Sequence, residues 1–276
     1  MKNNLIKLLT IDKEIRIYIV DATSILDNST LKSIKTEFIK KLYTKLFANC
    51  CLLGGFLTEN DQRLSISIRF KEPGCSVHCD IEGNGNINYM FSQQLVSFAG
   101  DFTNLVGDGA TLSITRGSWL GGMFTGTVEV CYDSVDLFFS HFYSKSEQTE
   151  TVFKTWRNNG ILRGCMIQPL PFTDDVNMKR VMESVNSNEM YISSAEWSDI
   201  PKFVFPYARI IEQYTLKSEC NCSKEMFFGM MMAVNIEDIK QAIQMNKEEE
   251  LVCGICGKKY RFNRNDLETI VKIKER

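Results

Sequence analysis

The sequence reads Cys220-Asn221-Cys222 and, thirty residues further on, Cys253-Gly254-Ile255-Cys256. Each pair can present two thiolates from one tight turn, and the segment between the pairs can fold back to bring four sulfur atoms together. Four sulfur ligands at about 2.3 Å complete the tetrahedron that Zn²⁺ adopts in structural sites. The spacing therefore predicts a zinc site with Cys220, Cys222, Cys253 and Cys256 as ligands, in preference to two unrelated pairs of buried or free cysteines.

Both spacings also suit redox chemistry. Sulfur atoms one or two residues apart can reach each other once the metal leaves, and metal-bound thiolates are the species that oxidants attack. A chain without an export signal is expected in a reducing compartment, where a static disulfide framework is the less frequent use of cysteine. The four cysteines are therefore interpreted equally as a metal site and as an oxidation sensor.

The residues around these pairs predict a small C-terminal module, residues 217–276. Its pattern indicates helices over 224–234, 236–245 and 264–273 and a strand over 258–262. About 60 residues is near the size at which a core alone gives marginal stability. Structural zinc contributes about 10–16 kcal/mol of binding free energy in small peptides, so folding of this module is expected to depend on its metal.

Upstream, the pattern predicts an α+β fold: a mixed core domain over residues 1–170 with a mainly antiparallel sheet. Residues 171–216 are interpreted as a helical linker region, because Pro169 and Pro171 end the core domain. The expected core strands cover 14–22, 64–70, 111–115 and 125–130, with a turn at 83–86, and the expected core helices cover 30–57, 135–143 and 149–156. In the linker region, helices are expected over 174–190 and 207–214.

Composition narrows the function classes. Hydrophobic residues make up 44% and charged residues 24% of the 276 positions, which is typical of globular chains. The net charge of −2 gives no electrostatic footprint for DNA or RNA. No apolar run reaches the roughly 18 residues of a membrane helix, and Lys7 interrupts the apolar patch near the start, which makes a poor signal peptide. We expect a cytoplasmic protein that binds neither nucleic acid nor membrane.

Several stretches of the chain together resemble one known family. They are CNCSKE (220–225), CGICGKKYRFNRNDLETI (253–270), the acidic stretch 248–250, IRIYIVDAT (15–23), YSKSEQTETV (143–152) and GCMIQPLP (164–171). The family they resemble is the 33 kDa chaperonin family, also called heat shock protein 33. The matches cover most of the chain, and the cysteine motif with its flanks is the most specific of them.

The resemblance implies a redox-regulated holdase: an ATP-independent chaperone, not an enzyme, that protects unfolding client proteins from aggregation under oxidative stress. It implies that the reduced state is zinc-bound and inactive, and that the four C-terminal cysteines are both ligands and switch. It further implies that oxidation forms the disulfides Cys220–Cys222 and Cys253–Cys256, that zinc leaves and the linker region unfolds, and that the active protein is a homodimer.

One face of the linker helix is a candidate for client binding. Its apolar residues stand at helical spacing, and unfolding of the zinc module is expected to remove the surface on which the linker helices rest. Methionine is flexible and polarisable, which suits unspecific contact. We therefore expect client binding at Met178, Val181, Met182, Val185 and Trp197. The same stripe is also compatible with a helix packed permanently on the core.

Two other functions are left open by the residues alone. A small basic strip, formed by Lys258, Lys259, Arg261 and Arg264, suits a zinc module that binds nucleic acid, although the acidic stretch 248–250 precedes it. The cysteines also suit a thiol-dependent enzyme, such as a peroxidase or a disulfide exchanger.

Six further cysteines have no assigned role: Cys50, Cys51, Cys75, Cys79, Cys131 and Cys165. Cys50 and Cys51 lie in an apolar helical run and are expected in the core. Cys75, His78 and Cys79 could form a second metal site, but the strand pattern over 77–81 favours side chains that alternate between two faces.

Overall fold

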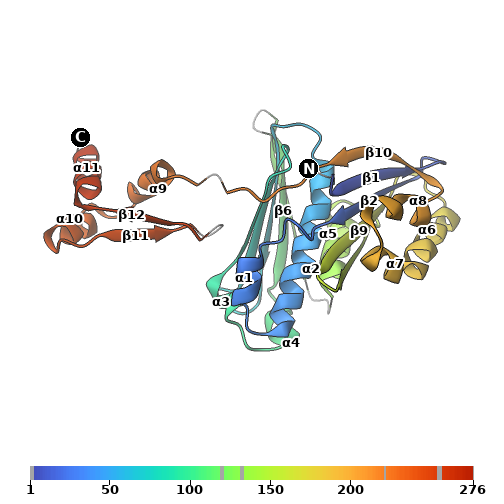
Figure 1. Ribbon diagram of the computed structural model, residues 1–276, viewed down its shortest axis with the longest axis horizontal. Coiled ribbons are helices and arrows are strands. Elements are labelled where there is room, and N and C mark those ends of the chain that lie inside the picture. The colour runs from blue at the N-terminus through green and yellow to red at the C-terminus, as the bar shows by residue number, and fades with distance from the viewer. Residues whose placement is uncertain (1–2, 119–120, 131–133, 221, 254–256, 276) are drawn as a thin grey trace. The chain divides into compact units, whose positions relative to one another are not determined.

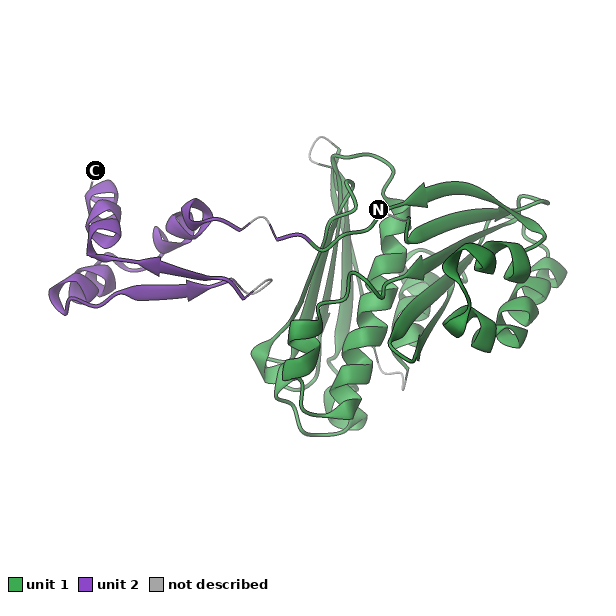
Figure 2. Ribbon diagram, in the orientation of Figure 1, with its two compact units in different colours: residues 1–218 green, residues 219–276 purple. Residues whose placement is uncertain are grey.

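The computed structural model describes residues 3–118, 121–130, 134–220, 222–253 and 257–275. The chain divides into two compact units, residues 1–218 and 219–276 (Figure 2). Each unit combines helices with strands. Every strand pairing within the three described sheets is antiparallel, so the predicted α+β class with antiparallel sheet is confirmed.

The first unit is built in layers (Figure 1). One five-stranded sheet has the order β10-β1-β2-β9-β8, and the other has the order β5-β4-β3-β6-β7. The strands of the first sheet are β1 (Leu5–Thr10), β2 (Ile15–Asp21), β8 (Val152–Asn158), β9 (Ile161–Pro169) and β10 (Ala208–Tyr214). Those of the second are β3 (Gln62–Arg69), β4 (Ser76–Glu82), β5 (Ile87–Phe91), β6 (Thr111–Ser118) and β7 (Gly122–Glu129).

Two long helices fill the space between the sheets: α2 (Glu37–Leu53) and α5 (Val135–Ser146). The side chain of Thr36 caps α2 by accepting a hydrogen bond from the Ile39 amide at 3.4 Å. Every residue from Leu46 to Leu53 is buried, because a helix between two sheets is covered on all sides. The short helices α1 (Asn28–Ser33), α3 (Gln93–Val96) and α4 (Phe102–Leu105) complete this region. No helix of the described residues is long and apolar enough to span a bilayer.

The expected helix over 149–156 is wrong, because strand β8 occupies this segment. Its side chains alternate in burial, and a tight turn at Asn159 and Gly160 connects it to β9. Both turn residues have positive φ, at 47° and 85°. An Asn-Gly pair between two apolar runs is a strong signal for a β-hairpin, and the prediction of a helix over 149–156 did not take it into account.

Residues 171–216 form three helices and a strand within the first unit. The helices α6 (Asp175–Ser187), α7 (Glu189–Ser194) and α8 (Ile200–Val204) pack on the sheet that contains β1, β2 and β9. The expected helix over 207–214 is wrong: this segment is β10, which pairs antiparallel with β1. In its sequence, ARIIEQY, the apolar residues follow neither the helical nor the strand period clearly. Pairing with the distant N-terminal strand therefore decides its structure.

The second unit has a small core of its own. Its elements are α9 (Lys224–Met231), α10 (Ile236–Gln244), β11 (Glu249–Val252), β12 (Lys259–Phe262) and α11 (Arg264–Lys274). The two strands form an antiparallel hairpin. The completely buried side chains are few, among them Phe262, Leu267 and Ile270, so little apolar burial stabilises this unit.

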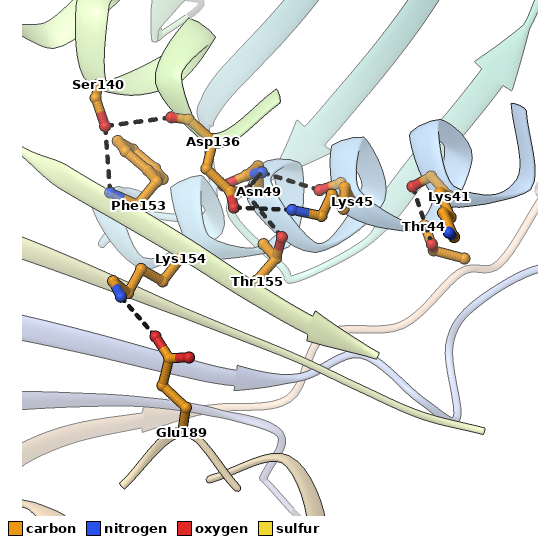
Figure 3. A network of polar contacts seen from close by, with 10 residues as sticks. All are labelled: Lys41, Thr44, Lys45, Asn49, Asp136, Ser140, Phe153, Lys154, Thr155 and Glu189. Atoms are coloured by element: carbon orange, nitrogen blue, oxygen red, sulfur yellow. Dashed lines mark hydrogen bonds and ion pairs between the residues drawn. The ribbon is translucent and has the colours of Figure 1, made fainter. Parts of the chain in front are cut away.

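A partly buried carboxylate joins the helical layer to the sheet (Figure 3). Asp136 on α5 accepts hydrogen bonds from the Asn49 amide and from the Thr155 hydroxyl, each at 2.8 Å. The Lys45 ammonium lies 3.3 Å from the same carboxylate. Asn49 is completely buried and Thr155 nearly so. The carboxylate therefore satisfies polar groups on α2 and β8 that water does not reach.

We predict that Asp136→Ala lowers the free energy of unfolding of the first unit by about 2–4 kcal/mol, because it leaves two buried donors without their acceptor. The check is urea denaturation followed by tryptophan fluorescence, since Trp119, Trp156 and Trp197 all precede residue 219. Asp108→Ala, at an exposed loop position, is the matched control and should change stability little. Equal stability of the two variants would contradict this role of the network.

Candidate metal centre

Three of the four predicted zinc ligands lie together in the second unit. The sulfur atoms of Cys220, Cys222 and Cys253 all lie within 4.8 Å of one another, and those of Cys220 and Cys253 are 3.6 Å apart. Sulfur atoms bound tetrahedrally at about 2.3 Å from zinc are about 3.8 Å apart. This is the only cluster of three or more metal-binding side chains among the described residues. The donor set and its spacing fit a zinc ion.

The predicted fourth ligand, Cys256, lies outside the described residues. Among the described residues on either side of it, the Cys253 amide donates to the Lys258 carbonyl at 2.8 Å, and the Gly257 amide donates to the Cys253 carbonyl at 2.9 Å. Gly257 has a φ of 71°, which glycine adopts without strain. Cys256 stays a predicted ligand.

The predicted ligands come from the start of a helix and the end of a strand. Cys222 directly precedes Ser223, which caps α9 by accepting a hydrogen bond from the Met226 amide at 3.3 Å. Cys253 directly follows β11. A metal bound here would tie the first helix of the unit to its hairpin.

Tyr260 is a further candidate residue of the site, and the sequence pattern did not single it out. Its hydroxyl lies 2.7 Å from the Cys222 carbonyl oxygen and 3.1 Å from the Cys222 sulfur, so it can donate to either. Its ring is buried and stacks on Phe227, with the ring centres 4.7 Å apart. Donors around a metal site orient the ligands and tune their affinity. The alternation of polar and aromatic residues in KYRF (259–262) was the sequence signal that could have found Tyr260, because it directs this side chain inward.

The remaining described cysteines have a different environment. Cys50, Cys51, Cys75, Cys79 and Cys165 are all buried in the first unit, and Cys131 lies outside the described residues. Burial raises the pKa of the Cys165 thiol to about 12, and it also raises the pKa of Cys51 and Cys79. A raised pKa keeps the thiol protonated at neutral pH and therefore a poor target for oxidants.

The strand that contains His78 and Cys79 alternates between two faces, as predicted. Cys79 is completely buried, whereas the His78 side chain is 43% exposed and its ring nitrogen lies 2.9 Å from the Asp80 carboxylate. That hydrogen bond is the main cause that raises the pKa of His78. His78 and Cys79 therefore do not converge on one metal.

The small basic strip of the second unit is largely paired with acids or an aromatic ring. Glu250 lies 2.7 Å from Lys259 and 3.1 Å from Arg261, and these two hydrogen bonds are the main causes that lower the pKa of Glu250. Arg264 pairs with Glu268 at 2.9 Å, and Lys258 lies over the Tyr260 ring. The acidic stretch thus neutralises part of the strip that the nucleic-acid alternative relies on.

The candidate client-binding residues lie on the helices that cover the first sheet. Val181 and Val185 are completely buried, and Met178, Met182 and Trp197 are partly buried against the same cluster. Sheet residues such as Ile17 and Ile167 form the other side of that cluster. The sheet of the first unit supplies the surface against which this apolar face packs, and the expectation that the C-terminal module supports the linker helices stays a prediction.

Comparison with known proteins identifies the family. The family model described as "Hsp33 protein" matches residues 3–263. The chain belongs to the Hsp33 family. The 33 kDa chaperonin of Latilactobacillus sakei is 25% identical over 98% of this Hsp33 chain and 99% of its own length. The 33 kDa chaperonin of Bacillus subtilis is 24% identical over 96% of each chain.

A solved structure confirms the Hsp33 fold. The crystal structure of the 33 kDa chaperonin of Thermotoga maritima matches with a TM-score of 0.83 and 16% sequence identity, covering 99% of both chains. At that identity the match supports the fold of this Hsp33 family member and not the details of its sites. The layered first unit and the cysteine-bearing second unit are thus both part of the shared architecture.

We predict that Tyr260→Phe weakens zinc binding by about 10–100-fold, the effect typical of losing a donor next to a metal ligand. Phenylalanine keeps the ring that stacks on Phe227, so the core of the second unit should persist. Zinc affinity is measured by competition with a chromogenic chelator, and Tyr207→Phe, a change on the first unit, is the matched control. An unchanged affinity would show that the hydroxyl does not support the site.

Proposed function

We propose that this Hsp33 family member is a redox-regulated, ATP-independent holdase. In this proposal the zinc-bound, reduced form is inactive, and oxidation of Cys220, Cys222, Cys253 and Cys256 releases zinc and activates the protein. The family supports the chaperone function, and the convergence of three cysteine sulfur atoms in a small unit is the observation that carries the regulation. The proposed compartment is the cytoplasm, and the proposed role is not enzymatic.

The first step is the loss of the metal. Zinc needs thiolate ligands, so each disulfide that forms removes two of them. We propose the disulfides Cys220–Cys222 and Cys253–Cys256, which join neighbours in the sequence. The second unit buries few apolar side chains, and it therefore unfolds once the binding free energy of zinc is lost.

The second step passes through the segment that precedes the zinc site. The side chain of Asn4 forms two hydrogen bonds with Leu216 in this segment. Its Nδ2 donates to the Leu216 backbone carbonyl at 3.0 Å, and its Oδ1 accepts from the Leu216 backbone amide at 2.7 Å. Lys217 exchanges two backbone hydrogen bonds with the hairpin at Gly85 and Ile87. Only two residues lie between Lys217 and Cys220. Unfolding of the second unit therefore acts directly on the end of β10.

The third step exposes apolar surface. Helices α6 to α8 connect β9 to β10, so loosening β10 frees their C-terminal end. Helices as short as α7 and α8 are not stable without tertiary packing. We propose that their release makes the buried cluster accessible, and that Met178, Val181, Met182, Val185 and Trp197 then bind unfolding clients. The oxidised protein is proposed to act as a homodimer.

We predict that the oxidised protein, and not the reduced one, suppresses aggregation of chemically unfolded citrate synthase in the absence of ATP. Light scattering measures aggregation, and a zinc-sensitive dye follows metal release in the same samples. Peroxide with mild heat should release zinc and activate the protein together. The proposal fails if the reduced, zinc-bound protein protects the client equally well, or if activation precedes zinc release.

We predict that replacing Met178 and Met182 by serine lowers protection of citrate synthase by the oxidised protein, because the variant loses apolar surface that activation exposes. Met190→Ser is the matched control: this methionine on α7 is 75% exposed already and adds nothing on activation. Both variants are first compared by thermal unfolding in the reduced form. If the double variant protects as well as the control, this helix face does not bind clients.

A further inference from the structure

Strand β7 is an open edge of its sheet. It is the last strand in the order β5-β4-β3-β6-β7 and, among the described residues, it pairs with β6 alone. The pairing runs without a register shift from Gly122 to Glu129. Natural proteins blunt such edges with lysine, proline or bulges. Strand β7 has none of these, and Glu129 at its end is its one charged residue.

The side of β7 near the β6–β7 turn presents apolar groups and a hollow. Phe124 is 72% exposed and Met123 49% exposed. Two adjoining hollows, of about 170 and 380 Å³, share Phe124, Phe56, Leu64 and Arg116 as lining residues. The charge of Arg116 is paired with Glu147 at 2.6 Å. An apolar side chain entering these hollows meets the apolar groups of Phe56, Leu64 and Phe124 together with polar atoms and one ion pair.

Gly126 allows helix α5 to approach β7 closely. A Cβ at this position would lie 2.3 Å from the hydroxyl of Ser146 and 3.0 Å from the Phe142 ring, so α5 packs directly against the backbone. Helix α5 thus covers the inner face of β7 and leaves its hydrogen-bonding edge to a partner. On the outer face, Thr125 and Thr127 bond to Thr115 and Ser113 of β6, each at 2.8 Å.

These features favour an extended polypeptide as the ligand of the β7 edge. In a strand at an edge, the amide and carbonyl groups of alternate residues point away from the sheet, and an added strand satisfies them. Residues 122–128 of this edge carry no charge and suit an uncharged segment, because no charge is desolvated when they pair. Uncharged segments with high β-propensity are also those through which unfolded chains aggregate.

We propose that β7 binds such a segment of an unfolding client by strand addition, with an apolar client side chain in the hollows beside Phe124. The inference rests on the proposed holdase function and names a second contact surface for it. This surface lies in the sheet that the linker helices do not cover.

The test compares lysine pairs on neighbouring strands of the oxidised, full-length protein. Thr125→Lys with Thr127→Lys places two charges on the edge strand. Ser113→Lys with Thr115→Lys places the same charges on the same face and breaks the same hydroxyl pairs, but one strand further in. We expect the β7 pair to weaken protection of chemically unfolded citrate synthase, and the β6 pair to weaken it less. Phe124→Ser, at an exposed position, should weaken client affinity by about tenfold.

Amide hydrogen exchange of residues 122–129 gives the direct readout. Strand addition predicts slower exchange in the complex with citrate synthase than in the oxidised protein alone. If the protein protects citrate synthase but exchange in β7 is unchanged, or the two lysine pairs behave alike, the edge inference is overturned while the holdase function stands. If exchange slows with protein concentration alone, β7 pairs with a second copy, and the client inference is overturned. If the oxidised wild-type protein protects no client, the proposed function itself fails.

Discussion

Three sulfur atoms held within 4.8 Å of one another are the arrangement on which the second unit depends. As thiolates without a cation they would repel, whereas a bound zinc ion makes the same arrangement strongly favourable. The unit has few other sources of stability, because its core is small and its ion pairs, such as Lys259–Glu250, are exposed. In the proposed function, a bound zinc ion would therefore connect the oxidation state of the cysteines to the folding of residues 219–276.

The same chain contains two chemically distinct groups of cysteines. Burial in the layered core keeps thiols such as Cys165 protonated, and it shields them from oxidants. Cys220 and Cys222 lie instead in partly exposed positions, at the point where the covalent chain leaves the first unit. In the proposed switch, a signal that begins at Cys220 reaches Lys217 through two residues of backbone, and Asn4 and Gly85 bind the segment 216–217 that follows β10. The position of Cys220 and Cys222 in the chain and the low reactivity of the buried cysteines thus support the same proposed redox switch.

Local patterns predicted most of the fold and the described ligands. The cysteine spacing indicated the cluster of Cys220, Cys222 and Cys253, and periodicity indicated α2 and α6, because both signals are local. One error, the helix expected over 149–156, overlooked the local Asn159-Gly160 turn signal, and the others arose where distant partners decide the structure. Strand β10 forms because β1 offers it a neighbour, and the segment's own sequence favours neither helix nor strand. Tyr260 was missed for the same reason, since its contact with Cys222 joins residues far apart in the chain.

The central claim is that bound zinc keeps the second unit folded and that its loss leaves the core layers intact. Amide hydrogen exchange of the full-length reduced protein, with and without a zinc chelator, tests it most directly. The account predicts that chelation brings residues 219–276 to the exchange rate of an unfolded chain, while α2 and β9 stay protected. Protection of residues 219–276 that survives complete removal of the metal would contradict the account.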